Sequence, residues 1–126
     1  NDRQRRLYFS WLRHRSHNRF LGIRFRSHWV AFLVADPWWV SWRGQRVGEI
    51  HELVVDPALW GRGLGSKLLE AGIQYLVQRG HRRIELWVGK DNLTAKRFYC
   101  RHGFRTGILW NNRWQQMLKY ERPNSK

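Results

Sequence analysis

The chain has 126 residues and carries 24 lysines and arginines against nine acidic residues, a formal net charge of +15. Its length suits one domain with a single core, no apolar run is long enough to span a membrane, and the arginine-rich start lacks the apolar block of a secretory signal. One cysteine excludes an internal disulfide, and Cys and His do not occur at metal-ligand spacing. We therefore expect one cytoplasmic domain over residues 1–126, without a metal.

The first predicted element is an amphipathic helix over residues 4–17, where a basic stretch places Leu7, Trp11 and Leu12 on one face. Apolar runs and turn residues then predict an antiparallel meander of three strands. Its parts, in chain order, are a strand at 29–35, a turn at Asp36-Pro37, a strand at 38–43, a turn at Gly44-Gln45 and a strand at 47–55.

Two helices and three more strands are predicted in the second half. Residues 62–79 form a helix that ends before Gly80, with one apolar face made of Leu64, Leu68, Leu69, Ile73, Leu76 and Val77. A buried strand follows at 84–88, and Asn92 caps the next helix. The chain ends in a hairpin of strands 104–110 and 114–120 across Asn111-Asn112.

The segment after the third strand is suited to holding phosphate. Pro57 ends that strand, because proline has no N–H to give to a sheet. Gly61, Gly63 and Gly65 let the backbone turn sharply, so that successive N–H groups face an anion at the positive end of a helix. An ordinary glycine-rich turn has the same pattern. The turn lacks the Gly-Lys-Ser/Thr ending of a Walker loop and the G-x-G-x-x-G spacing of a dinucleotide fold, so neither is indicated.

Two motifs resemble the GNAT superfamily of acyl-CoA-dependent N-acyltransferases. Motif A of that family is Gln/Arg-x-x-Gly-x-Gly/Ala, and here it reads Trp60-Gly61-Arg62-Gly63-Leu64-Gly65, with tryptophan at the first position. Residues 92–104 are similar to motif B, in which an asparagine opens a helix that ends in Tyr-x-x-x-Gly-Phe. The resemblance covers residues 47–105.

The resemblance implies an α/β fold with a mixed, mostly antiparallel central sheet flanked by helices. It implies transfer of an acetyl group from acetyl-CoA to a primary amine, by direct attack in a ternary complex. Because 126 residues is short for such an enzyme, we expect the N-terminal part to be abbreviated. The identity of the amine is beyond the sequence.

The resemblance also assigns an acetyl-CoA site. The backbone of residues 62–66 would hold pyrophosphate, and the backbone of residues 53–55 would run beside pantetheine and polarise the acetyl carbonyl. Charged side chains on the second helix would meet the outer phosphate, although a solvated helix face is the commoner reason for them, and Asn92 is equally explained as a cap. The full set is Leu53, Val54, Val55, Arg62, Gly63, Leu64, Gly65, Ser66, Lys67, Asn92, Lys96, Arg97 and Arg101.

Four residues are candidates for the chemistry. Tyr99 falls at the motif B tyrosine that lies near the thioester sulfur in this family, and a phenol can protonate a departing thiolate; a core tyrosine is the alternative. Glu49 and Glu52 are equally good candidates for the general base that accepts the proton of the amine, and His51 ranks next. Strand alternation places Glu49 and His51 on one face and Glu52 on the other. His102 is expected to cap the helix without a chemical role.

The positive charge predicts affinity for polyanions. It suggests an alternative function, a nucleic-acid-binding module on the same scaffold with weak or lost catalysis, and it favours an acidic protein or an RNA-linked amine as acceptor. An arginine-biased composition explains the charge about as well. Trp38, Trp39 and Trp42 suggest a substrate pocket or, more readily, a homodimer interface. The arginines in question are Arg3, Arg5, Arg6, Arg13, Arg15, Arg19, Arg24 and Arg26.

Overall fold

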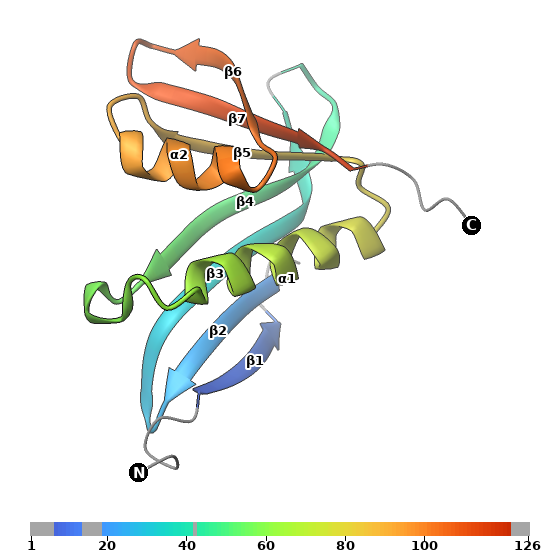
Figure 1. Ribbon diagram of the computed structural model, residues 1–126. Coiled ribbons are helices and arrows are strands. Elements are labelled where there is room, and N and C mark those ends of the chain that lie inside the picture. The colour runs from blue at the N-terminus through green and yellow to red at the C-terminus, as the bar shows by residue number, and fades with distance from the viewer. Residues whose placement is uncertain (1–6, 14–18, 42, 122–126) are drawn as a thin grey trace.

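A seven-stranded sheet and two α-helices form the described part of the chain, which comprises residues 7–13, 19–41 and 43–121 of a computed structural model (Figure 1). The strand order is β1-β2-β3-β4-β5-β7-β6, and only β4 and β5 pair in parallel. The expected mixed, mostly antiparallel sheet is therefore confirmed. The elements are β1 Leu7–Arg13, β2 Arg19–Phe25, β3 His28–Val40, β4 Arg46–Val55, the 3-10 helix η2 Pro57–Leu59, α1 Leu64–Gln78, β5 Arg83–Gly89, α2 Leu93–Arg101, β6 Arg105–Trp110 and β7 Trp114–Tyr120.

The N-terminal helix prediction is wrong where the structure describes it. Leu7–Arg13 is a strand that pairs antiparallel with β2, and the remainder of the predicted range, residues 4–6 and 14–17, lies outside the described residues. Leu7, Phe9 and Trp11 also alternate with a period of two, and aromatic residues favour strands. The spacing of the apolar residues therefore fits a strand as well as a helix. Pairing with β2, a strand that the sequence pattern did not predict, makes this segment a strand.

The predicted turn at Asp36-Pro37 is also wrong, because β3 continues through it to Val40. The pairing with β4 shifts between Asp36 and Trp39, which leaves one extra residue on β3. Proline cannot donate to a sheet, and a β-bulge is one of the places where a strand tolerates it. The next turn is confirmed, since Gly44 has a φ of 77° and its N–H donates to the Ser41 carbonyl at 2.8 Å.

A second bulge, at His51 in β4, corrects the predicted faces of this strand. Residues paired across a sheet share a face, and the pairs here are Val34↔Glu52, Ala35↔Ile50 and Asp36↔Glu49. His51 is the extra residue between them, so the alternation restarts after it. Glu52 therefore lies on the same face as Glu49, and not on the opposite one.

Both helices pack on one face of the sheet (Figure 1). A Cβ built on Gly48 would lie 3.2 Å from Leu76 of α1 and from Ile84 of β5, while Tyr99 of α2 belongs to the same buried cluster as Leu86. α1 buries the predicted apolar face except Val77, which is half-buried. In residues 7–13, 19–41 and 43–121 the opposite face, called the open face below, carries no helix.

The turn predictions in the second half are confirmed. Gly80, with a φ of 93°, follows the end of α1, and the Asn92 side chain accepts a hydrogen bond from the Ala95 N–H at 3.1 Å, which caps α2. Asn111 and Asn112 adopt φ values of 51° and 54° between β6 and β7. Asparagine tolerates this left-handed region, and the tight turn between the two strands requires it.

Candidate functional site

The two central strands pair only briefly and then diverge (Figure 1). Of the described residues, only Gly48, Glu49 and Ile50 of β4 pair with β5, opposite Ile84, Glu85 and Leu86. Leu53, Val54 and Val55 pair with β3 on their other edge. Beyond Ile50 the edge of β4 that faces β5 is therefore left without a strand, and its backbone can bind an extended ligand as an added strand would.

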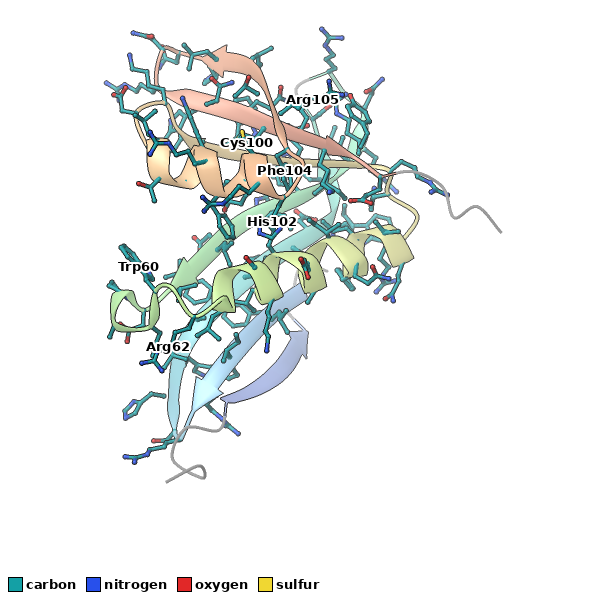
Figure 2. All side chains as sticks on the ribbon, viewed as in Figure 1. Trp60, Arg62, Cys100, His102, Phe104 and Arg105 are labelled. Carbon is teal, nitrogen blue, oxygen red and sulfur yellow. The ribbon has the colours of Figure 1, made fainter. Side chains whose placement is uncertain are left out.

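Trp60, at the departure from the family motif, lies at the end of this edge. Its indole Nε1–H donates to the Val55 carbonyl oxygen at 2.8 Å, and two thirds of the residue remains exposed. Figure 2 shows Trp60 and Arg62 on the loop that joins β4 to α1. The tryptophan thus holds the loop against β4, and its hydrogen bond occupies the carbonyl of Val55, at the end of the unpaired edge of β4.

The loop and the first turn of α1 have the backbone conformation that the sequence predicts for an anion site, and anion binding there stays a prediction. Gly61 and Gly63 have φ values of 83° and 77°, and a Cβ on either would meet no atom within 4 Å. The first helical bond runs from the Lys67 N–H to the Gly63 carbonyl at 3.1 Å, so the N–H groups of the three residues between them have no partner within the helix. α1 carries no acidic residue in its first turn, and Lys67 is exposed beside these N–H groups.

His102 joins the two helices across the gap (Figure 2). Its Nε2 lies 2.9 Å from Ser66 Oγ of α1, and its carbonyl accepts from Lys119 Nζ of β7 at 2.8 Å. It is also the C-cap residue of α2, and its N–H donates to the Tyr99 carbonyl at 3.0 Å. The expected capping position is confirmed, and the bond to Ser66 adds a link that the sequence did not indicate.

The charged side chains of α2 are unequal candidates for phosphate. Lys96 donates through Nζ to the Lys90 carbonyl, so its amino group is already engaged in holding the loop before α2. Arg97 and Arg101 are exposed. Asn92 uses its side-chain oxygen to cap the helix. The capping explanation of Asn92 is thus confirmed, while the phosphate role of these side chains stays a prediction.

Tyr99 is a buried residue on the helix-covered side of the sheet. It is 8 % exposed, and its ring lies edge to face against Phe98 at 5.2 Å and Phe104 at 5.7 Å between centroids. Burial raises the pKa of its phenol to about 12, because the phenolate would be poorly solvated there. Tyr99 therefore keeps its proton throughout the neutral range.

A cluster of acidic residues and a histidine lies on the open face, next to the point where β4 and β5 part. Glu49 is 4 % exposed and Glu85, directly opposite it on β5, is 1 % exposed. His51 Nε2 lies 2.9 Å from Asp36 Oδ2, and His51 Nδ1 lies 3.9 Å from Glu49 Oε1. Trp39 meets the imidazole edge to face at 4.9 Å. The structure thus brings Glu49 and His51 together, with Glu52 exposed on the same face.

The side-chain carboxyl of Glu49 has a raised pKa. Burial, followed by the charges of Glu85 and Asp36, raises its pKa from 4.5 to about 8. Sequence reasoning missed Asp36, which was assigned to a turn, and Glu85, which sat in a strand expected to be buried. Their only sequence signal is a carboxyl in an otherwise apolar strand, and the strand register is needed to show that they meet Glu49.

Part of the predicted surface lies outside the described residues. The structure does not describe four of the arginines and one of the tryptophans, namely Arg3, Arg5, Arg6, Arg15 and Trp42. It also leaves out the side chains of Arg13 and Arg19. Neither described helix is long and apolar enough to cross a membrane, and the described residues contain no group of three His, Cys, Asp or Glu arranged to hold a metal ion. The polyanion and homodimer expectations therefore stay predictions.

The chain belongs to the acetyltransferase (GNAT) family, whose model matches residues 1–104. It is 40 % identical over 115 residues to an uncharacterized N-acetyltransferase of Methanocaldococcus jannaschii, and this alignment covers 90 % of this chain and 50 % of the relative. A crystal structure of a Pyrococcus horikoshii OT3 protein matches with a TM-score of 0.77 at 35 % identity, over 82 % of this chain and 66 % of that one. The PaiA N-acetyltransferase of Thermoplasma acidophilum, solved with coenzyme A, has the same fold, with a TM-score of 0.68 at 21 % identity over 80 % of this chain and 59 % of that one.

Because this chain spans only half the length of the Methanocaldococcus relative, the single-domain expectation stays a prediction.

The pKa of Glu49 makes stability depend on pH. The unfolded carboxyl loses its proton near pH 4.5, whereas the folded one keeps it to about pH 8, so Glu49 increasingly destabilises the fold as pH rises between these values. Glu49→Gln cannot ionise and should escape this loss. Its free energy of unfolding, relative to that of the parent chain, should therefore be a few kcal/mol higher at pH 9 than at pH 5, at about 1.4 kcal/mol for each pKa unit.

Urea unfolding at pH 5 and pH 9 measures this gain. Glu52→Gln is the matched control, since it removes an exposed carboxyl from the same strand and should change stability by less than about 0.5 kcal/mol. An equal effect of Glu49→Gln at both pH values would show that this carboxyl is not shifted.

Proposed function

We propose that this chain transfers an acetyl group from acetyl-CoA to a primary amine, by direct attack in a ternary complex. The observation that carries the proposal is the unpaired edge of β4, which leads from the buried carboxyl cluster at one end to the anion site at the N-terminus of α1 at the other. Membership of the GNAT family supports it. The coenzyme A in the Thermoplasma acidophilum structure supports acetyl-CoA as the donor.

The donor would bind through the backbone more than through side chains. The free N–H groups of Leu64, Gly65 and Ser66 suit a pyrophosphate, and Arg62 and Lys67 add positive charge. The Leu53–Val55 edge suits the amide groups of pantetheine, which need both a donor and an acceptor. A free N–H on this edge would also polarise the acetyl carbonyl.

Glu49 is the proton acceptor that the geometry favours. A pKa of about 8 leaves its carboxyl partly ionised near neutral pH, where a general base is most useful. The amine nitrogen attacks the thioester carbonyl carbon, the carbon–sulfur bond breaks, and the proton lost by the nitrogen passes to Glu49. His51, oriented by Asp36, would hold this carboxyl in place or relay its proton. Glu52, being exposed, is the weaker candidate.

Tyr99 would assist the departing sulfur. An ordinary thiol has a pKa of about 8.5, well below the value of about 12 for this phenol. Full proton transfer from Tyr99 to the thiolate is therefore unfavourable by several kcal/mol. The phenol instead stabilises the developing charge with a hydrogen bond, and the proton comes afterwards from solvent. This refines the expected role from proton donor to hydrogen-bond donor.

The nucleic-acid alternative and an acceptor attached to an acidic macromolecule both rest on the net charge of +15. Of the eight arginines that suggested a nucleic-acid surface, four lie outside the described residues and two more have side chains that are not described, so no observation favours that function over acetyl transfer. The same charge argues against free polycations as acceptors.

Isothermal titration with acetyl-CoA tests the donor site. Binding should be saturable, and Gly63→Ala should weaken it about tenfold, because a side chain at a φ of 77° strains the loop that holds the phosphates. Gly80→Ala is the control: it places the same strain at the other end of α1, at a φ of 93°, and should leave affinity unchanged. An absence of binding heat would contradict the proposed function, and equal affinity in the two variants would contradict the proposed cradle.

Tyr99→Phe should lower kcat about 100-fold and leave the acetyl-CoA dissociation constant nearly unchanged, because the ring packing is kept and only the hydrogen bond to the sulfur is lost. Steady-state thiol release from CoA, measured with a panel of primary amines, gives kcat. Phe98→Leu is a control for packing beside Tyr99. Unchanged turnover in Tyr99→Phe would remove Tyr99 from the reaction.

The pH profile of kcat/KM identifies the base. If Glu49 accepts the proton, kcat/KM rises with pH to a plateau above about pH 8, where the carboxyl is ionised. Glu49→Gln should remove this inflection and lower the plateau. Persistence of the inflection in Glu49→Gln would transfer the role to His51 or Glu52, which His51→Gln and Glu52→Gln then separate.

A further inference from the structure

A pocket walled by tryptophans lies on the open face of the sheet. Its volume is about 440 Å³, and four indoles form most of its wall. They come from three places in the fold: the end of β3, the middle of β5, and the two ends of the β6–β7 turn, where Trp110 and Trp114 pair across the hairpin. The lining residues are Trp39, Val40, Glu85, Trp87, Trp110 and Trp114.

These indoles are not core residues. Trp39, Trp110 and Trp114 are each at least 40 % exposed, while the hydrophobic core lies on the other face, under the two helices. Keeping several large apolar rings half in water is unfavourable for the isolated domain. A concave cluster of them indicates a surface that receives an apolar ligand.

The base of the pocket is acidic. Glu85 lines it. Four buried side-chain atoms of the described residues have no hydrogen-bond partner, namely the acceptors Glu49 Oε2 and Glu85 Oε2 and the donors Arg83 Nε and Gln116 Nε2. Arg83 Nη2 lies 3.8 Å from Glu85 Oε2, beyond hydrogen-bond distance. With Asp36 the cluster has three carboxyls against His51 and Arg83. Of the four buried atoms, Glu85 Oε2 belongs to a residue that lines the pocket. A buried acceptor without a donor is unfavourable, so this carboxylate favours a ligand that brings an N–H donor and a positive charge.

The pocket also lies where an acceptor is needed. Glu85 is paired with Glu49, one residue before Ile50↔Leu86, the last pair before β4 and β5 diverge. An ammonium group held at Glu85 would thus be next to the favoured base and to the start of the free edge on which the donor is proposed to bind. The donor would occupy the gap from the helix side, whereas the pocket opens on the other face.

We propose that this pocket binds the acetyl acceptor, and that the acceptor is a monocationic amine joined by a short chain to an aromatic or other flat apolar group. The inference rests on the proposed function. Indole faces attract an organic cation and also pack against a flat ring. The walls offer few hydrogen-bonding groups for a polyhydroxylated amine, and a single carboxylate in the lining suits one positive charge better than several.

Calorimetric titration with four probes tests this recognition without any acetyl transfer. The probes are 2-phenylethylamine, the uncharged 2-phenylethanol, propylamine, which has the charge without the ring, and spermidine, with several charges. Each is titrated alone and with saturating CoA, which has no acetyl group to give. 2-Phenylethylamine should bind at least about tenfold more tightly than each of the others. Equal binding of the alcohol, or no saturation by the amine with or without CoA, would overturn the inference.

Substitutions localise the binding. Trp114→Ala and Glu85→Gln should each weaken the binding of 2-phenylethylamine about tenfold. Trp114→Ala removes one wall of the pocket on an exposed hairpin, and Glu85→Gln removes the charge while keeping the shape of the side chain. Trp29→Ala is the matched control, because Trp29 is a 44 % exposed indole of β3 outside the pocket lining. It should alter affinity less than twofold, and thermal unfolding checks that all variants fold.

The outcomes separate this inference from the proposed function. Selective amine binding that needs Trp114 and Glu85, in a protein that releases no thiol from acetyl-CoA, supports the pocket and contradicts the enzyme. Acetyl transfer with amine affinity unaffected by both substitutions supports the enzyme and contradicts the pocket. A dimer in sedimentation that buries these indoles and excludes the amine also contradicts the pocket.

Discussion

The divergence of β4 from β5 is the constraint on which the rest of the structure depends. Three residue pairs hold the two halves of the sheet together, and beyond Ile50 the polar backbone of β4 faces a gap instead of a neighbouring strand. A sheet edge of this kind is costly to leave unpaired in a protein interior. The gap is stable because the two helices are tied across it, through Ser66 and His102, and because α1 presents its N-terminal N–H groups at its far end. The fold thus maintains a backbone-lined slot whose hydrogen bonds a ligand can complete.

The carboxyl cluster at the closed end of the slot opposes stability. Glu49 and Glu85 are buried side by side, and burial raises the pKa of Glu49, so the fold loses stability at pH values where the unfolded carboxyl would be ionised. Apolar residues at these positions would pack without that cost. A chain with only nine acidic residues nevertheless places three of them, Asp36, Glu49 and Glu85, on adjacent strands. This arrangement is understandable for a site that handles a proton and a cation, and it has no benefit as a core.

The sheet divides the work between its two faces. The helix-covered face holds the hydrophobic core, Tyr99 and the N-terminus of α1, whereas the open face holds the carboxyl cluster and the tryptophan pocket. The bulge at His51 is what allows one strand to serve both, because the extra residue restarts the alternation and keeps Glu49, His51 and Glu52 together while Leu53 and Val55 face the core. Donor and acceptor would accordingly meet at β4 from opposite sides.

Local patterns in the sequence determined the elements whose signals are short-range. The glycine turn before α1, the apolar face of that helix, the Asn92 cap and the Asn111-Asn112 turn depend on the backbone preferences of a few neighbouring residues, and the structure has them where the sequence placed them. Family resemblance through the same stretches indicated the fold and the donor site.

Only the tertiary structure decided which residues meet across strands. Residues 7–13 have both helical and alternating spacing, and pairing with β2 makes them a strand. Pro37 looked like a turn, and β4 holds it in β3 by means of a bulge. Asp36, Glu85 and the four pocket tryptophans are far apart in the chain, and their meeting depends on register, in which one extra residue changes the face of every side chain that follows. Local propensity carries no information about that register, because it is set by the packing of the whole sheet.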